Sequence, residues 1–371
     1  MRRYLVELWR VACQEWRSIW RDEGVALITV FALFIYGISY SLGYGGEVLT
    51  EVPIAVVDED RSGSSRNMVR MIDASPKVSV ACELSDIGGL EPLIAERRAY
   101  GAVVIAPDFG KDILSRRQAR VAILGDASYL LAYREVVEGC VAAMQTKNEQ
   151  ILTARVGHYN PPLIYEQRNL FNPSFGYGVF VMPAIILLIV QQTALMGIGM
   201  LSATRRERGL LYASSSPFIV TVGRLPAELA TYIPTLGFML TVHYSSLDYP
   251  MRATWWRCVA VVVPYLLAVL FLAQALGATF RRRESPILWL LWLSIPFLLV
   301  SGVSLPSQAF PRWLYLLGKV VPSSSAVEAW IAVQSRGASL ADVVPELSIL
   351  WILTIIFGIG AVVANRSSRT H

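Results

Sequence analysis

Long runs of residues without charge constrain this chain more than any other feature of its sequence. Each run has about 20 residues, the length that a helix needs to cross the hydrocarbon of a bilayer. The runs cover residues 24–46, 178–203, 225–246, 258–280, 286–305 and 347–365, and only the third holds a charged side chain. Charged residues make up 16% of the chain, against about 25% in soluble domains. The sequence therefore predicts an α-helical membrane protein with six transmembrane helices.

Residues 47–175, between the first two runs, have a different pattern. Charged residues recur every few positions there, and the apolar runs have the length of strands. Strands are expected at 52–60, 77–84, 101–109 and 119–126, and helices at 61–73, 85–100 and about 129–156. Strands that alternate with helices favour a small α/β domain with a largely parallel sheet. We expect this domain to lie in water, inserted between the first and second spans.

Residues 1–22 are expected to form an interfacial amphipathic helix that lies on the membrane without crossing it. Its apolar face is Leu5, Leu8, Trp9, Ala12, Trp16, Ile19 and Trp20, and its polar face is Arg3, Arg10, Gln14, Arg17 and Arg21. This separation of faces at helical spacing is typical of a membrane-surface helix. A cleaved signal peptide is the alternative, but its apolar region has about 7–15 residues, fewer than the run at 24–46. We expect the first span to be retained.

Arginine and lysine are unevenly distributed over the segments that flank the spans, and the richer segments of such proteins face the cytoplasm. The richer segments hold Arg2, Arg3, Arg10, Arg17, Arg21, Arg205, Arg206, Arg208, Arg224, Arg281, Arg282, Arg283, Arg366 and Arg369, and the poorer ones Arg252, Arg257, Arg312, Lys319 and Arg336. Both termini, including the tail 366–371, are therefore expected in the cytoplasm and the α/β domain outside. The net charge of +5 needs no nucleic-acid partner, because anionic lipid accounts for it.

The sequence offers no set of residues for catalysis or metal binding. The histidines are His158, His243 and His371, and neither GxSxG nor HExxH occurs. The phosphate-binding loop GxxxxGK[ST] is also absent, so the chain alone is not expected to hydrolyse ATP. The run Asp58–Asp60 follows a strand, and no second cluster of ligands joins it, so turn chemistry is favoured over a metal or acid–base site.

Two of the four cysteines, Cys82 and Cys140, fall in the exterior domain, where a disulfide can form. Two separate buried cysteines are equally ordinary there, and pairing cannot be deduced from a sequence. The pair is a candidate disulfide with that alternative open.

Several segments, taken together and in order, resemble the membrane subunits of ABC type-2 exporters, in the bacterial subgroup with a large periplasmic domain. They are PIAVVDEDRSGSS, YGAVVIAPDFGKDIL, FNPSFGYGVFVMPAIILLIVQQTALMGIG, RRERG followed by SSSPF, and VPSSSAVEAWIAVQSRG. The resemblance extends over essentially the whole chain. Members commonly have Arg-Glu-(Arg/Lys)-Glu and then Gly-Thr after the second span, whereas Arg206–Gly209 is followed here by Leu210.

The resemblance implies a permease of the bacterial inner membrane that exports a drug, lipid or other amphiphile. It implies a second permease subunit, identical or paralogous, and two copies of a separate ATP-binding subunit that holds ATP and Mg. A periplasmic adaptor protein is a further candidate partner. The resemblance also implies that residues 304–337 form a re-entrant segment, and the prolines and interface aromatics within it agree.

Two groups of residues are candidates for function. The loop 204–224 is expected to couple to the ATPase, with a short helix at 207–213 docked in a groove of the partner. The coupling candidates are Arg205, Arg206, Glu207, Arg208, Leu210, Leu211 and Tyr212. An interfacial helix that rests on lipid headgroups is the alternative for this loop. Gln191 and Gln192, in the second span, are candidates for the transport path, with hydrogen bonding between helices as the alternative.

Two other functions remain open at this point. A six-span receptor or scaffold with a large exterior domain would need no ATPase, and co-purification of an ATP-binding subunit would separate it from a permease. A membrane enzyme that uses Asp58 or Asp60 is disfavoured for want of a partner cluster.

Overall fold

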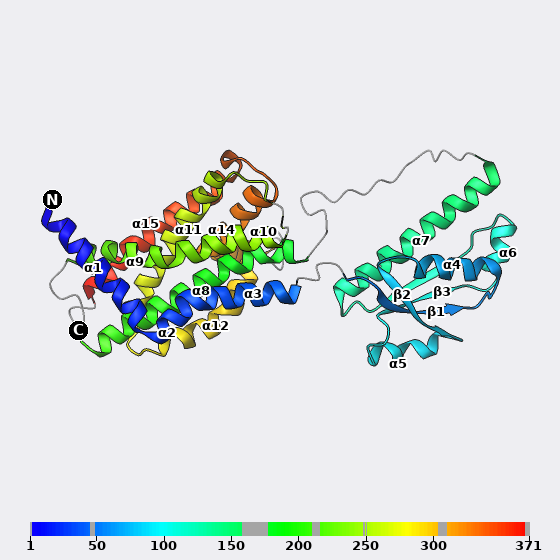
Figure 1. The fold of residues 1–371 in the computed structure, drawn as a ribbon, viewed down its shortest axis with the longest axis horizontal. Helices are drawn as coiled ribbons and strands as arrows, with labels where there is room; N and C mark the ends of the chain where they lie inside the picture. The colour runs from blue at the N-terminus through cyan, green and yellow to red at the C-terminus, as the bar shows by residue number, and fades with distance from the viewer. Residues whose placement is uncertain are drawn as a thin grey trace. The chain divides into compact units, whose positions relative to one another are not determined.

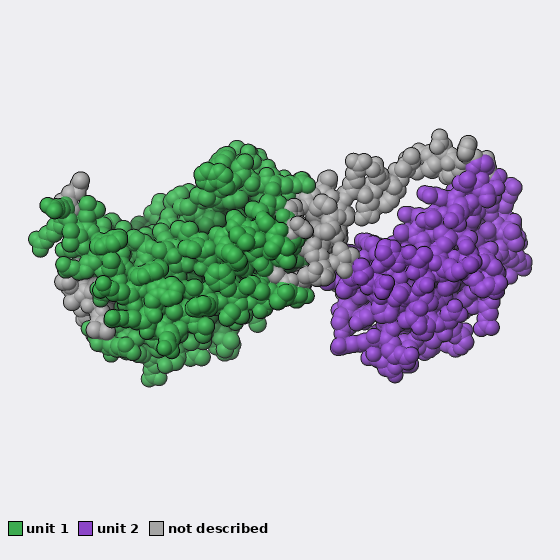
Figure 2. Space-filling view, in the orientation of Figure 1, with its two compact units in different colours: residues 1–47, 169–371 green, residues 48–168 purple. Residues whose placement is uncertain are grey.

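The computed structural model describes residues 2–44, 49–157, 177–209, 216–247, 249, 251–302 and 310–367. The chain divides into two compact units, which are described separately (Figure 2). The membrane unit comprises residues 1–47 and 169–371, and the α/β unit comprises residues 48–168. The predicted fold class is confirmed in its main features: a mostly helical chain with a small sheet in the inserted unit.

The membrane unit is built from helices alone among its described residues (Figure 1). Its first part contains α1 (Arg2–Arg21), α2 (Glu23–Ala26), the π-helix η1 (Leu27–Phe31) and α3 (Ala32–Tyr44). Its second part contains α8 (Tyr177–Glu207), α9 (Pro217–Phe238), the π-helix η3 (Met239–His243), α10 (Tyr244–Ser246), α11 (Trp255–Gly277), α12 (Ser285–Val300), α13 (Arg312–Lys319), α14 (Pro322–Trp330), the π-helix η5 (Ile331–Ser335), the 3₁₀ helix η6 (Leu340–Val343) and α15 (Val344–Ser367).

Five helical stretches among the described residues are long and apolar enough to cross a membrane. They are Glu23–Tyr40, Val181–Glu207, Pro217–Ser246, Trp255–Gly277 and Leu340–Ser367, and each overlaps one of the predicted spans. The remaining predicted span, 286–305, contains α12, which has 16 residues and is shorter than the roughly 20 that a span needs. Helix α13 and the stretch Pro322–Ser335 are bent by 91° at the break between them. The described part of the chain thus supports five spans, or six if the bent pair counts as one.

Two helices extend further than the charge pattern predicted. Helix α8 continues through Arg205 and Arg206, and α9 already begins at Pro217, so most of the predicted loop 204–224 is helical. Ser216 begins α9, because its hydroxyl accepts a hydrogen bond from the backbone N–H of Ile219 at 3.3 Å and a proline follows it at the first helical position. Arg224 was expected in the loop before the third span, but it lies within α9 and its charge is neutralised inside the unit.

Helix α1 packs along α9 and does not only rest on a membrane surface. Its buried face is Val11, Ala12, Glu15 and Ile19, whereas Trp9, Trp16 and Trp20 are exposed. The closest approach is at Gly223 of α9, where an added Cβ would lie 2.9 Å from the Cβ of Val11. The predicted amphipathic helix is therefore present, but its apolar side is divided between a protein-facing stripe and a stripe of tryptophans.

The core of the membrane unit is arranged around α8, whose apolar window is 83% buried. Helices α3, α11, α12 and α14 contact α8, and α15 packs on α11. Gly199 and Gly277 allow α8 and α11 to approach closely, since an added Cβ at Gly277 would lie 3.3 Å from the Cα of Gly199. Small residues at helix crossings are typical of membrane bundles.

The α/β unit contains a four-stranded mixed sheet in the order β2-β1-β3-β4. Strand β1 (Val52–Asp58) lies parallel to β2 (Val78–Leu84) and to β3 (Gly101–Ile105), and β4 (Val121–Gly125) is antiparallel to β3. The predicted strands are all present, and the sheet is largely parallel as expected. The antiparallel edge is the one departure.

Helices of the α/β unit cover both faces of its sheet (Figure 1). They are α4 (Gly63–Asp73), the 3₁₀ helix η2 (Ile87–Gly89), α5 (Leu90–Ala95), α6 (Phe109–Leu114) and α7 (Leu130–Val156). Ser62 begins α4, within the range 61–73 expected to be helical, by accepting from the backbone N–H groups of Ser64 and Ser65. The helix expected at 85–100 is shorter, because Arg97 adopts a left-handed φ of 57° that ends helical geometry.

Candidate functional site

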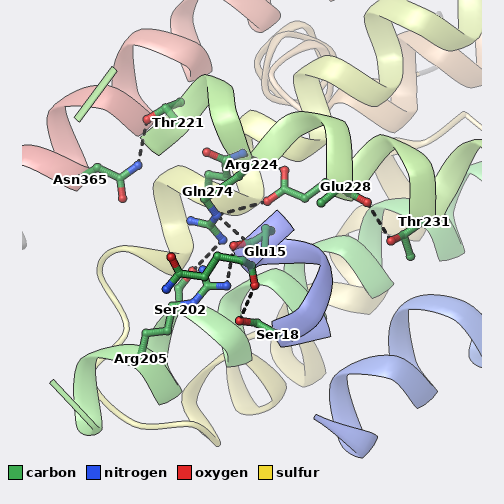
Figure 3. Close-up of polar contacts among 12 residues, drawn as sticks. Glu15, Ser18, Ser202, Arg205, Thr221, Arg224, Glu228, Thr231, Gln274 and Asn365 are labelled. Carbon is green, nitrogen blue, oxygen red and sulfur yellow. Dashed lines mark hydrogen bonds and ion pairs between the residues drawn. The ribbon is translucent and has the colours of Figure 1, made fainter. Parts of the chain in front are cut away.

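Four charged side chains come together in the interior of the membrane unit, next to the loop that was expected to couple to a partner (Figure 3). They are Glu15 of α1, Arg205 of α8, and Arg224 and Glu228 of α9, and we call them the ion cluster. All four are buried, with exposed fractions of 0%, 6%, 3% and 1%, respectively. The ion cluster joins segments that lie far apart in the sequence.

Glu15 is the centre of the ion cluster. Its Oε2 lies 2.5 Å from Nη2 of Arg205, and its Oε1 lies 3.2 Å from Nε of Arg224. Arg224 also lies 3.5 Å from Oε1 of Glu228, and its Nη2 donates to the hydroxyl of Ser202 at 3.2 Å. One carboxylate of α1 therefore holds the end of α8 and the beginning of α9 together.

A fourth helix enters the cluster through Gln274 of α11, whose Nε2 donates to Oε2 of Glu228 at 2.7 Å. The final helix is tied to the same region, because Nδ2 of Asn365 donates to the hydroxyl of Thr221 at 2.9 Å. The ion cluster and its hydrogen bonds thus connect α1, α8, α9 and α11, and a separate hydrogen bond ties α15 to the same part of α9 (Figure 3).

The charges of the ion cluster balance, with two carboxylates against two guanidinium groups. Removing an ion from water costs several kcal/mol, and only close, well-hydrogen-bonded partners offset that cost. A balanced cluster can be buried for this reason, whereas the loss of one member would leave an uncompensated charge. Such a cluster holds its helices in one arrangement and makes that arrangement sensitive to a displacement of any one helix.

Arg283, in the turn between α11 and α12, forms a second group of contacts at the end of α8. Its guanidinium makes an ion pair with Asp22, including an Nη2–Oδ1 distance of 2.6 Å, and its Nη1 donates to the hydroxyl of Thr204 at 2.9 Å. Its backbone N–H donates to Oε1 of Glu207 at 3.0 Å. Hydrogen bonding from Arg283 holds the pKa of Asp22 below its usual value. The turn, the end of α8 and the start of the first span are therefore tied together.

The predicted coupling residues separate into distinct environments. Arg205 is directed inward into the ion cluster, so it is not on a surface that a partner could contact. Arg206 is half-buried and donates from Nη1 to the carbonyl of Phe280 at 3.3 Å, while Glu207 and Arg208 are exposed. Leu210, Leu211 and Tyr212 lie outside the described residues. The structure thus shows where the segment is anchored: Arg205 and Glu207 on one side and Arg224 on the other.

Gln191 of α8, a candidate for the transport path, is completely buried. Its Oε1 accepts from the backbone N–H of Ser323 at 2.9 Å and satisfies the beginning of α14, where no capping side chain does so. Its Nε2 forms no hydrogen bond within the described residues, and neither do the buried hydroxyls of Ser323, Ser324 and Ser325. Gln191 is thus a helix-to-helix contact within a polar, buried junction. Gln192, the second candidate, is half-buried.

The acidic run at the end of β1 forms the turn that was favoured. Oδ1 of Asp58 accepts from the backbone N–H groups of Asp60 and Arg61, and its Oδ2 accepts from the hydroxyl of Ser65. Oδ2 of Asp60 accepts from the backbone of Gly110 at 3.0 Å. No group of three or more metal-ligating side chains occurs among the described residues.

Cys82 and Cys140 are free thiols and are not brought together. Cys82 belongs to the apolar cluster around α5, and Cys140 to the cluster of α4 and α7. Burial raises the pKa of the Cys140 thiol to about 11, so this cysteine is a packed apolar side chain and not a reactive one.

Sequence reasoning missed the ion cluster as a unit. It identified Arg205 and Arg224 as topological charges, and the one charged side chain that it noted within a span is Glu228. The available signal was Glu15, the acidic residue that stands at helical spacing between Val11 and Ile19 on the face that α1 buries. A carboxylate on a buried stripe requires a cation, but nothing in the sequence says which one.

Residues 24–363 match the sequence model of the ABC-2 family transporter proteins. A relative in Escherichia coli K12, the "Probable multidrug ABC transporter permease YbhR", is 21% identical over 355 residues, which cover 94% of each chain. The "Inner membrane transport permease YhhJ" of the same organism is 23% identical over 353 residues, which cover 93% of this chain and 92% of the relative.

Proposed function

Because the chain belongs to the family of ABC-2 transporter proteins, we propose that it is the membrane subunit of an ATP-driven exporter of the inner membrane. It is a multi-pass permease and not itself an enzyme, and the family places ATP hydrolysis in a partner subunit. Outward transport of an amphiphile is the proposed activity. A drug is the class suggested by the name of one relative, "Probable multidrug ABC transporter permease YbhR".

The ion cluster is the observation that supports this proposal. A permease without its own ATPase must receive motion from a partner at its cytoplasmic surface and pass it to the transmembrane helices. The segment between α8 and α9 is anchored by Arg205 and Arg224, which Glu15 holds together. A displacement of this segment would act directly on the ion cluster, and through it on α1 and α11. We propose that the ion cluster transmits the motion of the ATPase.

The route of the substrate is the second part of the proposal. Gln191 and Gln192 remain the proposed path residues, and the unbonded hydroxyls of Ser323 to Ser325 beside Gln191 support a polar contact there. The bend of 91° between α13 and the following helix supports a re-entrant segment at 304–337. A rearrangement at this junction would open α14 away from α8.

The partners and orientation follow from the family. We propose a dimer with an identical or paralogous permease, two ATP-binding subunits that hold ATP and Mg, and an exterior, periplasmic position for the α/β unit. The receptor or scaffold alternative gains no support from the family match.

The test is a pair of measurements on the complex. The tagged chain is purified with its ATP-binding subunit, and vanadate-sensitive ATP hydrolysis is measured together with ethidium efflux from energised cells. The chain without that subunit should show no hydrolysis, since it lacks a phosphate loop. The double variant Leu211→Asp, Tyr212→Ala should insert and fold but lose the partner and the efflux. Native partner recruitment and efflux by this variant would contradict the coupling role of the loop.

Orientation is tested separately by cysteine labelling. In a background without the native cysteines, Gln118→Cys of the α/β unit should react with a membrane-impermeant maleimide in cells with a permeabilised outer membrane. Arg282→Cys, in the turn after α11, should react only after lysis. The reverse pattern would overturn the proposed topology.

A further inference from the structure

The three tryptophans exposed on α1 are each followed directly by an arginine. The pairs are Trp9–Arg10, Trp16–Arg17 and Trp20–Arg21, with the same spacing of seven and then four residues in both series. Because neighbouring residues of an α-helix are separated by about 100° around its axis, the pairs form two parallel stripes. The tryptophan stripe lies next to the face that is buried on α9, and the arginine stripe lies one step further round.

The tryptophan stripe has little protein contact. Trp9 is 72% exposed, Trp16 40% and Trp20 45%, and the last two rings contact each other with their centroids 5.6 Å apart. Large aromatic side chains with a polar N–H are typical of the boundary between hydrocarbon and headgroups. Because the neighbouring face of α1 is fixed on α9 by Val11 and Glu15, the tryptophans cannot turn inward.

Among the described residues, no carboxylate forms an ion pair with the arginine stripe. Arg10, Arg17 and Arg21 are exposed. Arg17 and Arg21 are four residues apart, a spacing at which like charges repel along a helix. An external anion bound between them would relieve this repulsion.

A groove follows the arginine stripe. Its volume is about 610 Å³, and the described residues that line it, among them Trp9, Arg10, Arg17 and Arg21, all belong to α1. Guanidinium groups bind phosphate through paired hydrogen bonds, so the groove offers phosphate contacts directly beside an aromatic stripe that suits acyl chains.

We propose that α1 binds anionic phospholipids of the inner leaflet, with Arg10, Arg17 and Arg21 on the headgroup phosphates and Trp9, Trp16 and Trp20 at the acyl boundary. The charge of the stripe selects anionic over zwitterionic lipid, because arginines near an anionic surface each strengthen attraction to it. The position of α1 gives this binding a consequence: lipid seated on α1 holds the helix against α9 and thereby keeps Glu15 in the ion cluster.

The test measures lipid bound to the full chain. The chain is reconstituted in nanodiscs of phosphatidylcholine with a minority of phosphatidylglycerol, and retained lipids are counted by native mass spectrometry. In the triple variant Arg10→Gln, Arg17→Gln, Arg21→Gln, the affinity for phosphatidylglycerol should fall on the order of 100-fold, or about fivefold per arginine. The variant should therefore lose the enrichment of phosphatidylglycerol. The control Arg116→Gln, Arg117→Gln, Arg120→Gln changes three exposed arginines of the α/β unit and the same net charge, and it should retain the enrichment.

Equal enrichment in the wild-type chain and the α1 variant would overturn the proposal, as would an equal loss in the control. If the α1 variant keeps its lipid but no longer co-purifies with the ATP-binding subunit, the arginine stripe is a partner contact and not a lipid site. A measurement on the wild-type chain is independent of how the variants fold. Phosphatidylglycerol with a photoreactive headgroup should cross-link to the peptide 9–21 more than the matching phosphatidylcholine does, and equal cross-linking would also overturn the proposal.

Discussion

Glu15 and Arg205 lie 2.5 Å apart, from Oε2 to Nη2, in the interior of the membrane unit. They come from an amphipathic helix at the start of the chain and from the end of α8, so the pair closes a contact across 190 positions of sequence. Both side chains are buried, with exposed fractions of 0% and 6%. Because of this pair, the packing of α1 on the bundle depends on the position of Arg205 at the end of α8.

The substitution Glu15→Gln should therefore destabilise the chain strongly. It removes one negative charge from a balanced cluster and leaves the buried guanidinium groups of Arg205 and Arg224 with a single carboxylate, a change that costs about 3–5 kcal/mol. The free energy of unfolding, measured by denaturant titration of the purified chain, should fall by this order. Glu7→Gln is the control, because the half-buried Glu7 is paired, among the described residues, only with the exposed Arg3, at 4.0 Å. An equal effect of both substitutions would contradict the role of the ion cluster.

A second substitution should partly rescue the first. In Glu15→Gln with Arg205→Gln, the remaining pair of Arg224 and Glu228 is again balanced, at 3.5 Å. The double variant should be more stable than the sum of the two single effects predicts, with a coupling energy of about 0.5–3 kcal/mol. Strictly additive losses of unfolding free energy would show that the two residues act independently.

The contact between α1 and α9 should be sensitive to the side-chain volume at Gly223. An added Cβ at Gly223 would lie 2.9 Å from Val11 Cβ and 3.3 Å from the carbonyl oxygen of Leu8, and backbone cannot move aside as a side chain can. Gly223→Val should cost about 1–3 kcal/mol through overpacking and expose α1 to limited proteolysis. Gly237→Val is a matched control on the same helix, because nothing lies within 4 Å of its added Cβ. Protection of α1 in the Gly223 variant would contradict the close contact.

The ion pair between Asp22 and Arg283 should stabilise the folded chain at neutral pH, and this stabilisation should decrease in acid. Hydrogen bonding from Arg283 lowers the pKa of Asp22 in the folded chain, so this stabilisation is present above the unfolded pKa, which is about 3.9. It is lost as the pH falls through the lowered folded value. Asp22→Asn removes the charge but keeps a residue that can begin α2, where Asp22 accepts from the N–H of Val25.

The thermal midpoints of the wild type and Asp22→Asn, followed as a function of pH, measure this effect. The wild type should be more stable at neutral pH, and the difference should shrink toward zero in acid. A difference that stays constant at all pH values would show that the aspartate contributes through its shape and not through its charge.

The local elements of this fold could be predicted because their causes are local. Ser62 begins α4 where a serine-rich turn precedes a helix pattern, and the strands of the α/β unit follow from apolar runs that end in turn residues. Five of the predicted spans coincide with apolar helices for the same reason. Each of these features depends on residues within one or two helical turns or one strand.

The ion cluster could not be predicted, because it depends on contacts between segments far apart in the chain. Arg224 was expected to lie just before the third span, since a lone arginine in lipid is costly, but Glu15 and Glu228 neutralise it and α9 already begins at Pro217. Arg205 likewise looked like a surface charge. A sequence shows that a charge needs a partner, but not where the fold supplies it.

Substitutions of Arg205 and Arg208, at the end of α8, should have different effects. This difference tests the proposed coupling most directly. Arg205 is buried in the ion cluster, whereas Arg208 is exposed one turn further on. Arg205→Gln should lower the free energy of unfolding of the isolated chain, because it leaves Glu15 underpaired, whether or not an ATP-binding subunit is present. Arg208→Gln should leave that free energy within about 0.5 kcal/mol of the wild type, as an exposed substitution does, yet weaken assembly with the ATP-binding subunit. Unfolding of the chain alone and retention of the subunit in high-salt washes measure the two effects separately.

If Arg208→Gln leaves assembly unchanged while Arg205→Gln abolishes it at unchanged stability, then the partner is contacted through Arg205. In that case the ion cluster is not the element that carries the motion inward.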